Sequence, residues 1–131
     1  MKKILITLLL LVSTNVLAVD WVVAAGTDDF TDYIDLQSIR RDGNKVRAWT
    51  LSDYKSGKVL RDNKTRYLSE VNRMEFDCFE DTSRKIDLYL YSEKMEKGDI
   101  VISVPNLTNP ATSLPPGSVG ATELKIACAT K

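Results

Sequence analysis

The chain has 131 residues, with 18 basic and 18 acidic side chains, two cysteines and no histidine. This length allows one domain, and the balanced charge argues against nucleic-acid binding, which needs a basic surface. Without histidine, Ser-His-Asp catalysis and His-containing zinc sites are excluded, and two cysteines cannot form a four-cysteine zinc site, so the composition argues against an enzyme and against a bound metal or cofactor.

Residues 1–18 have the layout of a secretory signal peptide. Lys2 and Lys3 precede an apolar run over residues 4–12, and the triplet 16–18 (VLA) is typical of a cleavage site. The run is too short to span a bilayer as a mature helix, although an uncleaved anchor or a buried strand is an alternative. We expect cleavage after Ala18 and export of residues 19–131, either to the periplasm or by secretion to the cell surface or the medium. No cysteine lies near this point, so a lipid anchor is not expected.

Export changes the interpretation of the two cysteines. In an oxidising compartment an even cysteine count favours a disulfide, and Cys78 with Cys128 is the one possible pair. Closing a loop of this length would stabilise the fold by roughly 4 kcal/mol. Two buried free thiols are an alternative, and so is a redox pair, although such pairs usually have the C-x-x-C spacing.

Six segments have the composition or the alternation of β-strands. They are residues 20–25, 30–35, 45–54, 67–78, 84–92 and 100–104. Residues 36–41 read as an irregular or single-turn connection, and 42–44 (DGN) as a hairpin turn. Polar turns are expected at 55–58, 80–83 and 94–99. These short connections leave no room for crossover helices, so the sheet should be antiparallel.

The alternation also predicts which side chains share a face of the sheet. In residues 84–92, Ile86, Leu88 and Leu90 fall on one face. Lys85, Tyr89 and Tyr91 fall on the other, together with Asp87. In residues 67–78, Cys78 shares the core face with Met74 and Phe76.

The chain ends with a change of pattern. Residues 105–117 contain all four prolines and predict a surface connection. Ser118 is a candidate N-cap for a helix over residues 118–129, in which Ala121, Leu124 and Cys128 share one face. The predicted fold class is therefore α+β: a six-stranded antiparallel meander with one C-terminal helix packed on a face and tethered by a Cys78–Cys128 disulfide.

The order of these segments resembles the surface-adhesin protein E-like family of Gram-negative bacteria. The resemblance rests on the two cysteines and on short motifs at 20–23 (DWVV), 33–35 (YID), 77–78 (DC), 84–86 (RKI) and 91–92 (YS). It covers nearly all of residues 19–131 and implies the sheet-and-helix fold described above. It also implies an exported adhesin that binds a protein partner such as host vitronectin or laminin, and a possible homodimer.

Four residues are candidates for a binding surface. Arg84 and Lys85 match the basic pair of the family pattern, which the resemblance associates with host-protein binding. Tyr89 and Tyr91, placed with Lys85, would form an exposed aromatic and basic patch of the kind enriched at interfaces. The alternatives are a charged sheet edge that discourages aggregation, and a face buried beneath a dimer.

The remaining features point to structure rather than chemistry. Asp28, Asp29, Asp32 and Asp35 lack the spacing of a calcium loop and read as a solvated turn and strand start. Trp21 and Trp49 read as core or interface anchors. A small carboxylate hydrolase is disfavoured, because one sheet and one helix leave little room for a deep cleft.

The alternative to a host-binding adhesin is a periplasmic accessory or inhibitor protein that binds a bacterial partner.

Overall fold

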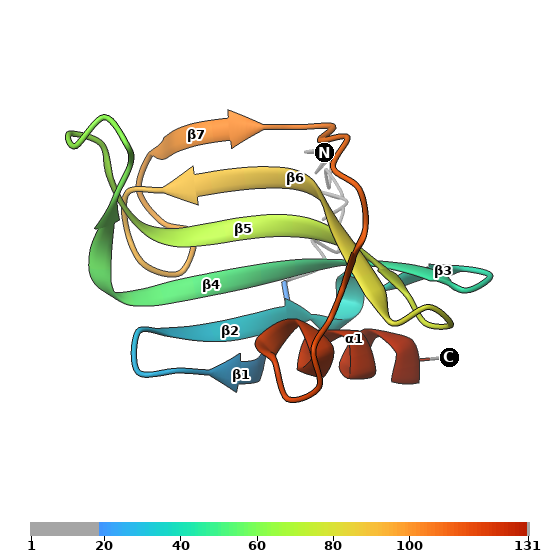
Figure 1. Ribbon diagram of the computed structural model, residues 1–131. Helices are drawn as coiled ribbons and strands as arrows, with labels where there is room; N and C mark the ends of the chain where they lie inside the picture. Colours follow the sequence, from blue (N-terminus) through green and yellow to red (C-terminus); the bar gives the residue numbers. More distant parts are fainter. Residues whose placement is uncertain (1–18, 131) are drawn as a thin grey trace, which may run out of the picture.

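The computed structural model describes residues 19–130, so the predicted signal peptide (1–18) lies outside the described residues. One antiparallel sheet carries a single α-helix (Figure 1). The strands are β1 (Trp21–Gly26), β2 (Phe30–Asp35), β3 (Arg40–Asp42), β4 (Lys45–Val59), β5 (Arg66–Asp77), β6 (Thr82–Tyr91), β7 (Ile100–Val104) and β8 (Thr112–Ser113). The helices are the 3₁₀ turn η1 (Leu36–Ser38) and α1 (Val119–Ala129). Within 19–130, no helix is long and apolar enough to cross a membrane.

The main path of the sheet is the predicted meander. The strand order is β1-β2-β4-β5-β6-β7, and neighbouring strands pair antiparallel. The sheet has eight strands rather than the predicted six, because β3 pairs with the start of β4 and β8 with the start of β6. Neither was predicted, since β3 contains no apolar residue and β8 has only two residues within the proline-bearing connection. Strand β3 nevertheless positions Arg41, whose Nη2 donates to the Cys128 carbonyl oxygen at 2.7 Å.

Two predicted turns are placed wrongly: residues 55–58 belong to a strand, and the turn predicted at 80–83 lies at 78–81. Strand β4 continues through the predicted turn at 55–58 to Val59, which pairs with Arg66 after a shift of register beyond Asp53. Strand β6 begins at Thr82, inside the predicted turn at 80–83. Both segments are polar, so their composition indicated a turn even though their backbone joins the sheet.

Helix α1 covers one face of the sheet, where it contacts β1, β4 and β5 (Figure 1). The predicted N-cap is confirmed, because the Ser118 side chain accepts a hydrogen bond from the Ala121 amide at 3.2 Å. Leu124 and Ala127 pack against a fully buried cluster from the sheet that includes Phe76. This packing stabilises a helix that would be too short to persist alone in water.

We expect the Ser118→Ala variant to lose about 1 kcal/mol of unfolding free energy, because one amide at the start of α1 loses its acceptor. Urea denaturation followed by circular dichroism measures the change. Ser56→Ala, at an exposed position in β4, is the matched control. Equal destabilisation of the two variants would contradict a capping role for Ser118.

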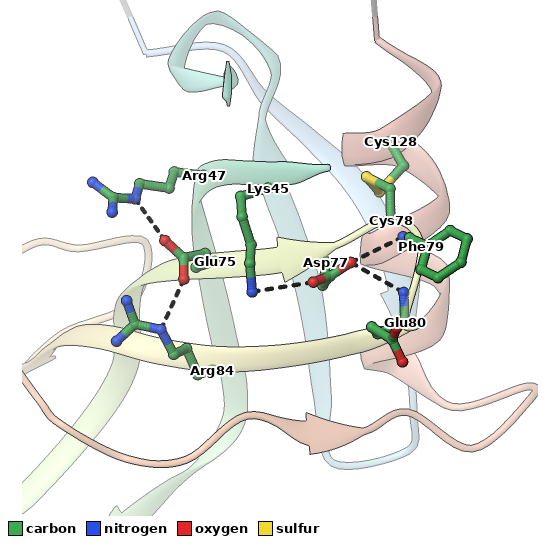
Figure 2. A network of polar contacts seen from close by, with 9 residues as sticks. All are labelled: Lys45, Arg47, Glu75, Asp77, Cys78, Phe79, Glu80, Arg84 and Cys128. Atoms are coloured by element: carbon green, nitrogen blue, oxygen red, sulfur yellow. Dashed lines mark hydrogen bonds and ion pairs between the residues drawn. A yellow bond between two sulfur atoms is a disulfide. The ribbon is translucent and has the colours of Figure 1, made fainter. Parts of the chain in front are cut away.

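The turn between β5 and β6 sets the position of the disulfide. The Asp77 Oδ1 accepts hydrogen bonds from the Phe79 and Glu80 amides, each at 3.0 Å, and its Oδ2 lies 3.1 Å from Lys45 Nζ (Figure 2). These contacts hold the pKa of Asp77 below its usual value, with the Glu80 amide as the largest cause. The turn presents Cys78 to Cys128 of α1, and the predicted disulfide is confirmed.

Candidate protein-binding face

The face of the sheet opposite α1 carries an open pocket. Val46 and Ala48 face the helix, so Arg47 and Trp49 project to the other side by the alternation of β4. The pocket there has a volume of about 770 Å³. Aromatic and basic side chains dominate its lining, and we call it the aromatic pocket. It includes Trp21, Arg40, Arg47, Trp49, Arg73, Tyr89, Tyr91, Glu96 and Ile100.

The centre of the aromatic pocket is held by contacts between three strands. The rings of Trp49 and Tyr89 lie 6.1 Å apart, and the guanidinium of Arg73 lies 5.9 Å from the Trp49 ring. Arg73 is paired in turn with Asp87, with 2.8 Å between Nε and Oδ2. Such aromatic and cation–π contacts fix the orientation of the rings while leaving them partly exposed.

The wall of the pocket towards β7 comes from the connection after β6. Glu96 lies on this connection and accepts a hydrogen bond from Trp21 Nε1 at 3.4 Å. Ser69 of β5 fixes the connection, because its Oγ accepts from the Glu96 amide and donates to the Glu93 carbonyl oxygen. Burial raises the pKa of Glu96 above the usual value of a glutamate.

Two arginines converge on one carboxylate beside the aromatic pocket (Figure 2). Arg47 Nε lies 2.9 Å from Oε2 of Glu75, and Arg84 Nε lies 2.8 Å from Oε1. Burial opposes the ionisation of Glu75, but the two guanidinium groups outweigh it and hold its pKa below the usual value. We call these three residues the Arg47–Glu75–Arg84 clamp.

The structure separates the four candidate binding residues. Tyr89 and Tyr91 line the aromatic pocket, and Arg84 lies on the same face in the clamp. Lys85 lies on the opposite face, so the predicted grouping of Lys85 with the two tyrosines is wrong. A shift of register between β5 and β6 places Lys85 opposite Met74 and Asp87 opposite Arg73, which interrupts the alternation at Ile86.

Lys85 instead belongs to a polar cluster between the sheet and α1. Its Nζ pairs with Glu70 Oε1, and Tyr54 donates to Oε2 of the same carboxylate at 3.1 Å. Asp32 of β2 and Glu123 of α1 also belong to this cluster, and each is only 5 % exposed. Lys85 therefore forms an ion pair with a largely buried acid, and its own side chain is 31 % exposed.

The acidic group at the start of β2 differs from its predicted environment. Asp28 and Asp29 are exposed as expected, but Asp32 and Asp35 are buried. Asp35 caps η1 by accepting from the Gln37 amide at 3.0 Å. Within residues 19–130, no group of three or more histidine, cysteine or acidic side chains is arranged to hold a metal ion.

Sequence reasoning missed Arg47, Glu75 and Arg73 as members of the candidate site. Each looks like an ordinary solvent-facing residue of an alternating strand. Their grouping depends on the pairing of β4 with β5 and of β5 with β6, which places Arg47 and Arg84 on either side of Glu75. The sequence signal is the charge alternation itself, because opposite charges are favoured at directly paired positions.

Comparison with known proteins supports this fold. Three solved structures of Haemophilus influenzae protein E are similar. The crystal form II structure has a TM-score of 0.62 and 18 % identity, covering 81 % of this chain and 91 % of that one. The selenomethionine form has a TM-score of 0.59 and 19 % identity, covering 87 % and 94 %.

Two sequence comparisons gave different results, one with single curated proteins and one with a family of proteins. No curated protein sequence matches the chain. Residues 21–129, from the first residue of β1 to the last residue of α1, match the family described as surface-adhesin protein E. The chain therefore belongs to the surface-adhesin protein E family.

Proposed function

We propose that the chain is an exported, non-catalytic protein-binding module that binds its partner on the face of the sheet opposite α1. The observation that carries this proposal is the aromatic pocket. Tryptophan, tyrosine and arginine are the residues most enriched at the centres of protein interfaces, and Trp49, Tyr89 and Arg73 occupy the middle of this face. The adhesin family and fold also suggest a non-enzymatic role.

The first candidate partner is a host protein of the vitronectin or laminin kind, as the family resemblance implies. The second is a bacterial protein in the periplasm, with this chain as an accessory or inhibitor protein. It is favoured by Val19, rather than a lipid-accepting cysteine, at the expected mature N-terminus. Cell fractionation separates the two: exposure on the outer surface supports the host partner, and a purely periplasmic pool supports the bacterial one.

Binding to immobilised vitronectin and laminin is measured by surface plasmon resonance with the oxidised mature chain. We expect saturable binding to at least one of them, and a Kd weakened roughly tenfold or more by Tyr89→Ala, because this removes an aromatic ring at the pocket centre. Lys125→Ala, at an exposed position on α1, is the control.

Two outcomes contradict parts of this proposal. An absence of saturable binding to both proteins removes the host-matrix version. Binding that Tyr89→Ala leaves unchanged removes the aromatic pocket as the binding site.

The possible homodimer is tested on the same samples by light scattering, since a monomer at micromolar concentration would contradict it.

A further inference from the structure

The Arg47–Glu75–Arg84 clamp has hydrogen-bonding capacity that Glu75 does not use. Each guanidinium reaches the Glu75 carboxylate through its Nε, one to each oxygen. The terminal Nη groups of both arginines point away from Glu75 and towards the same side of it (Figure 2). An arginine presents its donors as a planar fork that matches the two oxygens of a carboxylate.

The clamp also has an excess of positive charge. Glu75 supplies one negative charge against two positive ones, and two neighbouring acids are engaged, Asp77 by Lys45 and Asp87 by Arg73. The hollow beside the clamp has one further acid in its lining, Asp42, against the basic residues Arg40, Arg41, Lys45 and Arg47. The Glu75 side chain is 9 % exposed, whereas those of Arg47 and Arg84 are 54 % and 30 % exposed. The negative partner is therefore buried beneath two accessible cations, an arrangement that attracts an external anion.

Pairing with Glu75 reduces the entropy that Arg47 and Arg84 would lose on binding a ligand. A free arginine loses considerable side-chain entropy when it is fixed by a ligand. Here the Nε of each guanidinium is already fixed, so a second carboxylate meets groups that are largely ordered. Glu75 is thus a positioning residue for Arg47 and Arg84.

The place of the clamp on the sheet indicates the kind of ligand. Arg47 and Arg40 line both the aromatic pocket and a smaller basic hollow of about 250 Å³, which Glu75 also lines. A ligand that spans the two would place an anionic group at the clamp and an apolar group against Trp49 and Tyr89. A protein segment with an acidic residue close to aromatic or aliphatic residues has this chemistry.

We propose that Arg47 and Arg84, oriented by Glu75, bind a side-chain carboxylate of an acidic and apolar segment of the partner protein, whose neighbouring residues occupy the aromatic pocket. This inference rests on the proposed protein-binding function and adds the chemistry of the partner and the residues that recognise it.

The test uses a short synthetic peptide in which aspartate alternates with phenylalanine, and the same peptide with asparagine in place of aspartate. Binding to the oxidised mature chain is measured by titration, with the ¹⁵N signals of the arginine Nε groups as the structural readout. We expect the aspartate peptide to bind roughly tenfold or more tightly than the asparagine peptide and to shift the Nε signals of Arg47 and Arg84.

Three variants separate a positioned fork from general attraction between charges. Arg47→Lys keeps the charge but removes the fork, and Glu75→Gln adds one net positive charge but removes the positioning carboxylate. We expect both to weaken binding of the aspartate peptide, whereas attraction by net charge alone predicts tighter binding by Glu75→Gln. Arg61→Gln, at an exposed loop position, is the control for loss of charge. Circular dichroism and thermal unfolding confirm that each variant is folded.

The possible results have distinct meanings. Vitronectin or laminin binding that Arg47→Lys and Glu75→Gln leave unchanged overturns this inference and leaves the proposed function intact. Peptide binding through Arg47 without binding to either protein supports the inference and directs the search to another acidic partner. No binding of the aspartate peptide, or stronger Arg47-dependent binding of a heparin oligosaccharide than of the peptide, overturns it.

Discussion

The free energy of unfolding of the variant Cys78→Ser/Cys128→Ser will be about 4 kcal/mol lower than that of the oxidised wild-type chain. The disulfide closes a loop with a sequence separation of 50, and its loss restores the conformational entropy of that loop to the unfolded state. In the folded chain the bond that is removed is the covalent link between α1 and the turn after β5. Urea denaturation at fixed pH measures the difference.

Wild-type chain treated with a reductant should reproduce the behaviour of the double variant, since both lack the same cross-link. The midpoint of unfolding in urea should fall in both cases. Serine in both positions avoids the intermolecular disulfides that a single free thiol would form. A loss below about 1 kcal/mol would contradict the loop-entropy account and would mean that noncovalent packing of α1 suffices.

The second large effect concerns Glu123 on the buried side of α1. It lies with Asp32 of β2, which accepts a hydrogen bond from Ser52 of β4, and close to the Lys85–Glu70 pair of β6 and β5. Burial, reinforced by the negative charge of Asp32, raises the pKa of Glu123 to about 9. Burial likewise raises the pKa of Asp32. Glu123 therefore stays protonated at neutral pH in the folded chain.

This proton makes stability depend on pH. An unfolded glutamate loses its proton near pH 4.5, whereas the folded chain keeps it until about pH 9, so unfolding releases a proton throughout this window. Stability falls as pH rises, by at most about 1.4 kcal/mol per pH unit. Glu123→Gln keeps a neutral hydrogen-bonding group, so we expect it to flatten this slope and to be more stable than wild type near pH 8, by at most about 5 kcal/mol.

Urea denaturation at several pH values between about 5 and 8.5 tests this expectation. Glu80→Gln, at an exposed position in the β5–β6 turn, is the matched control and should keep the wild-type slope. Glu70 and Glu75 have lowered pKa values, so their contribution is lost only as pH falls below the usual range of a glutamate, outside this window. An unchanged slope in Glu123→Gln would contradict a buried protonated Glu123.

The features that could be predicted from the sequence are those with local signals. Alternation predicted the meander, the Ser118 cap followed from the change to helical spacing, and the pairing of Cys78 with Cys128 followed from the cysteine count. Strand boundaries were less accurate where polar residues continue a strand, as in the second half of β4, because turn composition and paired polar backbone look alike in sequence.

The features that could not be predicted depend on how distant segments meet. One shift of register between β5 and β6 moved Lys85 to the helix side, and no residue type marks such a bulge in advance. Asp32 is buried beside Glu123, which lies on the last element of the fold. The clamp likewise exists only once Glu75 stands between two particular strands.

The position of the Cys78–Cys128 disulfide in the chain implies an order of folding steps. Each main strand after β1 pairs with a strand that precedes it in the chain, so the sheet can assemble progressively from the N-terminal side. Helix α1 comes last, and until it docks, Cys78 lacks its disulfide partner Cys128 and the apolar surface around Phe76 stays uncovered. Formation of this disulfide therefore reports that the last helix has docked on the finished sheet.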